Sequence, residues 1–187
     1  MGCFVGLEVA TGLFSRVGPG SAYILGSREW KFGMPKLKTL PPAARVLRRS
    51  ILELCVADQG HDPAILARWL SNKTPGDVAS WIALPDNSVL VAVEDDAIVA
   101  VGSVTDVGHI ALNYVSPDAR FRGVSRALLG ALETRAMERG STRCTLNSSE
   151  TARAFYLANG YIIDGPPDRK HGVGGYPMCK LLTLHKS

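Results

Sequence analysis

The segment from Val115 to Leu129 constrains the fold more than any other part of the sequence. An apolar run breaks at Ser116-Pro117, a short basic loop follows, and apolar residues then repeat at helical spacing. A helix N-terminus after such a loop binds anions, because its backbone N–H groups lack partners within the helix and the helix dipole favours negative charge. Arg120 and Arg122 would add charge-assisted contacts, and Gly123 would let a ligand approach the backbone. The sequence therefore predicts a pyrophosphate-binding loop between a strand and a helix.

The order of the expected elements indicates the fold class. Two helical segments follow Pro41-Pro42, a long helix runs from Val124 to Gly140, and another helix begins at Asn147. We expect strands at residues 88–93, 97–104, 109–115, 142–146, 161–164 and 176–184. This order predicts an α/β fold with a mixed, mostly antiparallel central sheet flanked by helices, with the long helix crossing it.

The chain length indicates one domain with an appendage. With 187 residues, a single core can form without disulfides or metals. Residues 1–34 are rich in glycine up to Gly33 and have no clear hydrophobic period, so we expect them to be an extension outside the core. The domain is then expected to cover residues 35–187.

Composition argues against several classes of protein. The net charge is +4, but the basic residues are dispersed, so a nucleic-acid partner is not expected. No run approaches the ~18 apolar residues of a membrane-spanning helix. The four cysteines are far apart, at positions 3, 55, 144 and 179, and the cysteines and histidines lack metal-ligand spacing. We therefore expect a cytoplasmic protein without a metal ion or a disulfide framework.

Two motifs resemble the GNAT acyltransferase superfamily. The loop Arg120-Phe121-Arg122-Gly123-Val124-Ser125 is similar to its acyl-CoA loop, [RQ]-x-x-G-x-[GA], with Ser125 at the last small position. The run from Ala152 to Tyr161 matches A-x-x-[LF]-Y-x-x-x-G-[FY]. The resemblance implies a GNAT fold, with acetyl-CoA as the donor and a small-molecule or peptide amine as the acceptor, joined by direct attack. It also implies that backbone groups near Val115 and the loop bind the donor. A homodimer through the final strands is an open alternative.

The resemblance also assigns catalytic roles. Tyr156 occupies the position whose hydroxyl reaches the CoA sulfur as a general acid, although Phe155 and Tyr156 are also interpretable as a core aromatic pair. His109 stands where several members carry Glu, and its usual pKa near 6.5 suits a base acting through water. The alternative for His109 is a strand-edge histidine bonded to the backbone.

Two asparagines are further candidates. Asn147 is expected either to bind the pantetheine arm, since Ser149 stands where the family often has Asn, or to cap the following helix. Asn113 is expected to line the acyl or acceptor pocket, because a buried amide needs partners.

The leading hypothesis is an acetyl-CoA-dependent N-acetyltransferase. The alternative is a non-catalytic acyl-CoA-binding regulatory module that kept the loop and lost turnover. We expect residues 58–69 and 165–176 to form the acceptor site, whose mixed charge is compatible with a polyamine, an aminoglycoside, an amino acid or a protein N-terminus.

Overall fold

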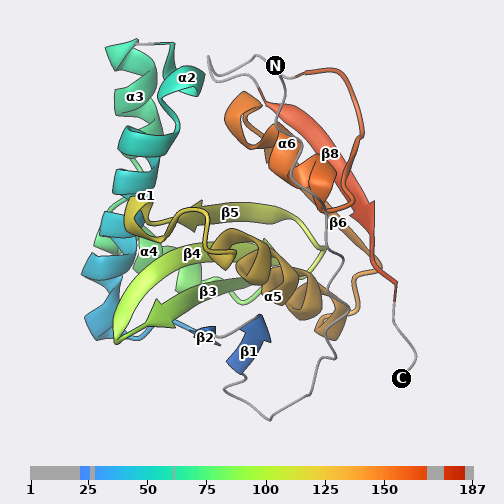
Figure 1. Cartoon of the computed structure of the whole chain (residues 1–187), viewed down its shortest axis with the longest axis horizontal. Helices are drawn as coiled ribbons and strands as arrows, with labels where there is room; N and C mark the ends of the chain where they lie inside the picture. Colours follow the sequence, from blue (N-terminus) through green and yellow to red (C-terminus); the bar gives the residue numbers. More distant parts are fainter. Residues whose placement is uncertain (1–21, 26–27, 61, 168–174, 184–187) are drawn as a thin grey trace, which may run out of the picture.

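Two antiparallel sheets form the centre of the molecule (Figure 1). The computed structural model describes residues 22–25, 28–60, 62–167 and 175–183. The larger sheet has the order β1-β2-β3-β4-β5, with β1 (Ala22–Leu25), β2 (Arg28–Gly33), β3 (Asn87–Glu94), β4 (Ala97–Thr105) and β5 (Ile110–Val115). The smaller sheet has the order β6-β8-β7, with β6 (Arg143–Ser148), β7 (Ile162–Ile163) and β8 (Tyr176–Leu181).

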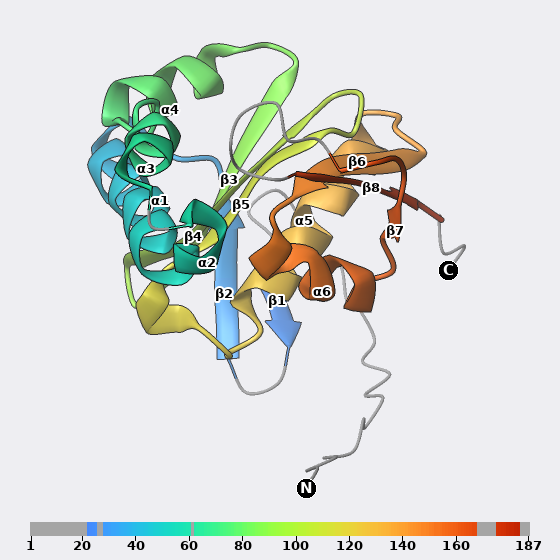
Figure 2. The same cartoon turned by 90° about the horizontal axis from the view of Figure 1, so that it is seen from above.

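Helices cover both faces of the larger sheet (Figure 2). One face carries the helices α1 (Leu40–Leu54), α2 (Val56–Gln59), α3 (Pro63–Leu70) and α4 (Pro75–Ala83), preceded by the short 3-10 helix η1 (Leu37–Thr39). The other face carries α5 (Val124–Glu138), which follows the 3-10 helix η2 (Pro117–Ala119). The helix α6 (Glu150–Ala158) packs against the smaller sheet. Each face of the larger sheet therefore has its own apolar core, one around α1 and α4 and one around α5.

The β3–β4 hairpin follows from its sequence. Asp95 and Asp96 both have positive φ, of 47° and 61°, as the tight two-residue turns of hairpins require. The alternating side chains of β3 then divide between the two cores: Val89 and Val91 pack toward α1, and Leu90 and Ala92 pack toward α5. The predicted strands at 88–93 and 97–104 are confirmed.

Among the described residues, the two sheets pair at one end of β5 only. An isolated parallel bridge pairs His109 with Thr145, and the Thr145 N–H donates to the Gly108 carbonyl at 2.9 Å. A Cβ on Gly108 would lie 2.1 Å from the Arg143 carbonyl oxygen, and its φ is +81°, so only glycine fits here. Beyond this bridge β5 is the edge strand of the larger sheet. The sheets therefore diverge along β5 toward Val115.

The predicted fold class is confirmed: a mostly antiparallel sheet is flanked by helices, and α5 crosses it. One local expectation is wrong. Asn147 does not cap α6, because β6 continues to Ser148 and the Ser149 hydroxyl accepts the Ala152 N–H at 3.4 Å.

Strand β2 lies before the domain boundary expected at residue 35. It pairs with β3 over Lys31–Gly33, and Trp30 and Phe32 belong to the core beside α5. The buried Trp30 and Phe32 alternate with the exposed Lys31, as in a strand that packs one face on a core. Residues 1–21 lie outside the described part of the chain.

The helices in the described ranges are all too short or too polar to cross a membrane.

Trp30 should be essential for stability if β2 is part of the core. Its side chain is 1% exposed, so Trp30→Ala is expected to lower the free energy of unfolding by about 3–5 kcal/mol, measured by urea denaturation. Leu37→Ala is the control, because Leu37 is 84% exposed and its truncation should change stability by no more than about 0.5 kcal/mol. Equal effects of the two substitutions would mean that Trp30 is not part of the core.

Candidate active site

A cavity of about 720 Å³ lies where the two sheets diverge. Its walls come from α1, α3, the whole of β5, the loop before α5, the end of β6 and the start of α6. All six residues of β5 line it, because the strand edge that faces β6 is open beyond the His109–Thr145 bridge. Backbone N–H and C=O groups of an edge strand can pair with an extended ligand.

The loop before α5 presents an uncapped helix N-terminus to this cavity. Gly123 is the N-cap residue, with a φ of +85°, and none of the described side chains caps the helix. The first backbone N–H groups of α5 are therefore free for a ligand. Gly123, Val124 and Ser125 line the cavity together with Arg120 and Arg126. This arrangement can bind an anion through backbone donors, a helix dipole and two guanidinium groups.

Phe121 gives the loop its shape. Its φ is +59°, which is uncommon for a residue with a side chain, and the ring is 93% exposed. The Arg120 guanidinium lies over this ring, 4.6 Å from its centroid. Phe121 also lines the cavity.

Arg122 is directed elsewhere. Its Nη2 atom forms a 2.8 Å ion pair with Glu94 at the end of β3, and Arg122 is not among the cavity-lining residues. The structure therefore does not bring Arg122 to the anion site, contrary to the expectation from the sequence. Arg126, one turn into α5, lies at the cavity instead.

Strand β2 packs against the loop before α5 through Trp30. The Trp30 ring is almost fully buried, and its Cη2 atom lies 3.5 Å from the position that a Cβ on Gly123 would occupy. Together with the Arg122–Glu94 ion pair, this contact fixes the loop on the larger sheet. Part of the region expected to lie outside the domain therefore supports the candidate site.

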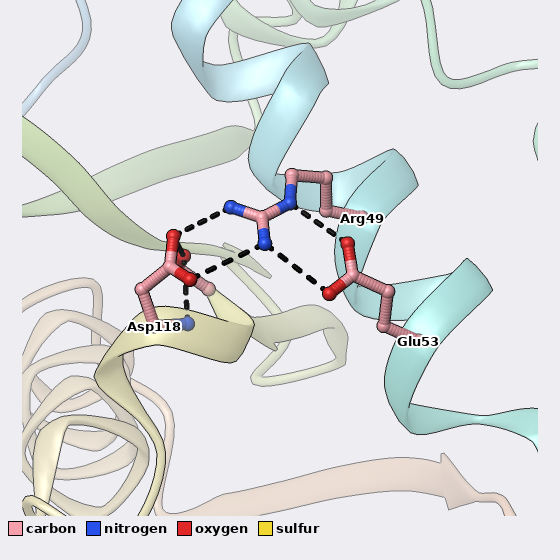
Figure 3. Close-up of polar contacts among 4 residues, drawn as sticks. Arg49, Glu53 and Asp118 are labelled. Atoms are coloured by element: carbon pink, nitrogen blue, oxygen red, sulfur yellow. Dashed lines mark hydrogen bonds and ion pairs between the residues drawn. The ribbon is translucent and has the colours of Figure 1, made fainter.

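A second attachment joins the loop to α1 (Figure 3). Arg49 lies between two carboxylates: its Nη1 atom is 2.5 Å from Asp118 in η2, and its Nε atom is 2.8 Å from Glu53. The hydrogen bond from Arg49 holds the pKa of Asp118 below its usual range. Because these groups are exposed, the contact orients η2 more than it stabilises the fold.

Tyr156 projects from α6 into the cavity. It is 8% exposed and packs edge-to-face with Phe155 and Tyr161, at centroid distances of 5.1 and 5.6 Å. Burial raises the pKa of Tyr156 to about 12, and hydrogen bonding from Asn113 opposes this rise. The hydroxyl is therefore protonated at neutral pH and can donate a proton. Tyr156 is a core aromatic residue and a cavity residue at once.

Asn113 carries an unpartnered oxygen at the cavity. Its side chain lines the cavity, as expected, and its Oδ1 atom is buried without a hydrogen-bond partner among the described residues. A buried amide oxygen normally has a donor. Asn113 can therefore accept an N–H from a ligand beside Tyr156.

His109 does not reach the cavity. Its side chain is exposed at the point where the sheets meet; Nδ1 lies 3.1 Å from the Thr145 hydroxyl, and the backbone N–H donates to Thr105 Oγ1. The structure therefore does not bring the predicted base together with Tyr156, and the strand-edge alternative describes His109 better. Five residues of β5 lie between His109 and Val115.

The side of the cavity formed by α1, α3 and α6 is rich in aromatic and apolar groups. Trp69 on α3 donates its Nε1–H to the Tyr114 hydroxyl at 3.0 Å. Leu54 and Cys55 at the end of α1, and Phe155 on α6, complete this side. Burial raises the pKa of Cys55 to about 12, so its thiol is not an activated nucleophile. Of the expected acceptor region, Trp69 is at the cavity, whereas residues 61 and 168–174 lie outside the described ranges.

The remaining predicted donor contacts also lie at the cavity. Val115 and Asn147 line it, as does Ser149. Sequence reasoning missed Arg126, Trp30 and Tyr114. Arg126 follows Gly123 by three residues and could have been found from its place in the first turn of α5, whereas nothing in the local sequence identifies Trp30 or Tyr114 as site residues. Within the described ranges, no three His, Cys, Asp or Glu side chains are grouped to hold a metal ion.

Comparison with known families gives one match. Residues 61–182 match the family model described as the acetyltransferase (GNAT) domain. A search of curated proteins finds no match to this sequence.

Solved structures share the fold. The GCN5-related N-acetyltransferase from Rhodopseudomonas palustris is 24% identical, with a TM-score of 0.71, over 81% of this chain and 94% of that one. The PaiA N-acetyltransferase from Thermoplasma acidophilum, solved in complex with coenzyme A, is 15% identical, with a TM-score of 0.70, over 81% and 98% of the two chains. An aminoglycoside 6'-N-acetyltransferase complexed with coenzyme A is 15% identical, with a TM-score of 0.61, over 83% and 99%.

The raised pKa of Tyr156 predicts a loss of stability in alkali. The unfolded tyrosine ionises near pH 10 and the folded one near pH 12, so the unfolded state releases its proton first and stability falls as pH rises through this window. Between pH 8 and pH 11 the wild type should lose about 1 kcal/mol more unfolding free energy than Tyr156→Phe. Urea denaturation at the two pH values measures this difference. Equal losses in the two proteins would mean that Tyr156 is not buried as described.

Proposed function

Because the chain belongs to the acetyltransferase (GNAT) domain family, we propose that it transfers an acetyl group from acetyl-CoA to a primary amine by direct attack. The observation that carries this proposal is a single cavity that contains a free helix N-terminus, an open strand edge and a buried tyrosine hydroxyl. These are the three groups needed to hold a diphosphate, an extended amide-containing arm and a thiol leaving group. The acetyl donor supplies an activated thioester carbonyl.

The residues of the cavity fit such a donor. The backbone N–H groups at the start of α5, with Arg120 and Arg126, would hold the diphosphate. The open edge of β5 would pair with the amides of the pantetheine arm, as an added strand does. Asn147, near the end of β6, lines the same cavity across from β5.

Tyr156 is proposed as the general acid. In the transfer, the amine nitrogen bonds to the acyl carbon and the bond from that carbon to sulfur breaks. Sulfur takes a proton from the Tyr156 hydroxyl, and the nitrogen releases one proton to solvent. The tyrosinate then takes one proton back from solvent, which restores the tyrosine. A tyrosine with a pKa near 12 is fully protonated at neutral pH, so the proton is present when the sulfur leaves.

The alternative, a non-catalytic acyl-CoA-binding module, differs in one measurable property. It would bind the donor without releasing thiol.

Three described cysteines are free, which is compatible with the proposed location in a reducing cytoplasm.

Thiol release tests the proposed transfer and the role of Tyr156 together. Acetyl-CoA is incubated with a panel of primary amines, and free thiol is followed with time. We expect amine-dependent release by the wild type, and a kcat about 100-fold lower in Tyr156→Phe with little change in donor affinity. Donor binding without thiol release would favour the binding module, and an unchanged kcat would remove the proposed role of Tyr156.

Arg126 and Arg122 form a matched pair for the donor site. Arg126→Ala should weaken coenzyme A binding about tenfold, the loss of roughly one charge-assisted hydrogen bond. Arg122→Ala should change it by less than about threefold, because Glu94 already holds this guanidinium away from the cavity. Isothermal titration calorimetry measures both. The reverse order of effects would mean that Arg122 is the residue that contacts the phosphates.

A further inference from the structure

The acceptor side of the cavity is an aromatic and apolar surface assembled from four elements. Leu54 and Cys55 come from the end of α1, Trp69 from α3, Tyr114 from β5 and Phe155 from α6. We call these five residues the apolar wall. It faces the same cavity as Asn113 and Tyr156, so a group bound against it lies beside the proposed proton donor.

The polar atoms of the apolar wall are largely engaged within the protein. The Trp69 Nε1–H is bonded to the Tyr114 hydroxyl, so the indole donor is already used. Burial raises the pKa of the Tyr114 hydroxyl and that of the Cys55 thiol. Desolvation is the largest cause of both rises, ahead of the negative charge of Asp58, and desolvation disfavours an ion of either sign. The apolar wall therefore favours neutral, apolar groups.

The charged side chains that line the cavity do not belong to the apolar wall. Across the described residues, the charged side chains that line it are Arg120 and Arg126, both beside the start of α5. A ligand with several ammonium groups would meet two like charges there and an apolar surface opposite. A ligand with one amine and an apolar body would bring one nitrogen instead of several and would place its body against the apolar surface.

Asn113 supplies a polar anchor for one nitrogen. Its buried Oδ1 atom has no partner among the described residues, and it lies on β5 next to Tyr114 of the apolar wall. A carbonyl oxygen accepts a hydrogen bond from a neutral amine as well as from an ammonium. One N–H of the acceptor therefore satisfies an oxygen that the fold leaves unpaired.

We infer that the acceptor is a primary monoamine attached to an aromatic or similarly apolar body, which packs on the apolar wall while its nitrogen bonds to Asn113. The inference rests on the proposed acetyl transfer and specifies its substrate class. It also accounts for deprotonation without His109. Desolvation against the apolar wall lowers the pKa of an ammonium group, so the ammonium loses a proton to water and the neutral amine attacks.

The first test compares 2-phenylethylamine with spermidine. Each amine is titrated into the coenzyme A complex of the protein to obtain Kd, and kcat/KM is measured with acetyl-CoA. We expect 2-phenylethylamine to be favoured at least tenfold in both, a difference of about 1.4 kcal/mol. Equal values, or a preference for spermidine, would overturn the inference.

A charge placed on the apolar wall sharpens the test. Leu54→Glu adds a carboxylate at the end of α1, and Leu54→Gln is the matched control of the same size without charge. Leu54→Glu should shift the ratio of the two Kd values at least tenfold toward spermidine, and Leu54→Gln should keep the wild-type order. Equal ratios in the two variants would overturn the placement of the acceptor on this wall.

A longer acyl group is the competing occupant of the same surface. Kinetics with acetyl-CoA and octanoyl-CoA distinguish the two. A tenfold preference for octanoyl-CoA, with no discrimination between the amines, would assign the apolar wall to the donor and overturn the inference. A selective Kd for 2-phenylethylamine without thiol release with any amine would support the ligand class and overturn the proposed transfer.

Discussion

The contact between Gly108 and β6 is the constraint on which the site depends. At this point the backbone of β6 lies so close that a side chain on residue 108 would overlap the Arg143 carbonyl. The two sheets are thereby joined at one end of β5 and diverge toward the other. If the pairing continued along β5, the strand edge would be occupied and the cavity would not exist. One short junction between two ordinary antiparallel sheets therefore creates both an open strand edge and the space beside it.

The loop at the wide end of this opening is held by contacts from three directions. Trp30 packs beneath Gly123, Glu94 binds Arg122, and Arg49 binds Asp118. These contacts come from β2, β3 and α1, which are distant from the loop in the sequence. The free N–H groups of α5 are therefore presented in a fixed orientation. Preorganisation of this kind reduces the conformational cost of binding a ligand.

The sequence predicted the elements whose signals are local. The strands at 88–93 and 97–104 and the helix after Gly123 depend on neighbours in the chain, and the structure agrees with them. The directions of side chains were harder to predict. Arg122 and Arg126 are the same residue type and lie four positions apart in the sequence. Only the fold determines that Arg122 pairs with Glu94, whereas Arg126 lies at the cavity. His109 lies at the start of the expected strand, but the bridge to Thr145, which no local pattern encodes, holds this end of β5 where the two sheets meet. Trp30 was missed for a different reason, since its strand pairs with β3, which lies far along the chain.

The open edge of β5 also determines which substitutions the site can tolerate during evolution. Main-chain N–H and C=O groups are present whatever the side chains are, so a donor recognised through them survives extensive changes in the strand sequence. The surface built from α1, α3 and α6 has no such protection, because its chemistry changes with each replaced side chain. Under the proposed placement of donor and acceptor, a lineage with this architecture can therefore exchange acceptors through a few substitutions in the helices while it retains the same donor.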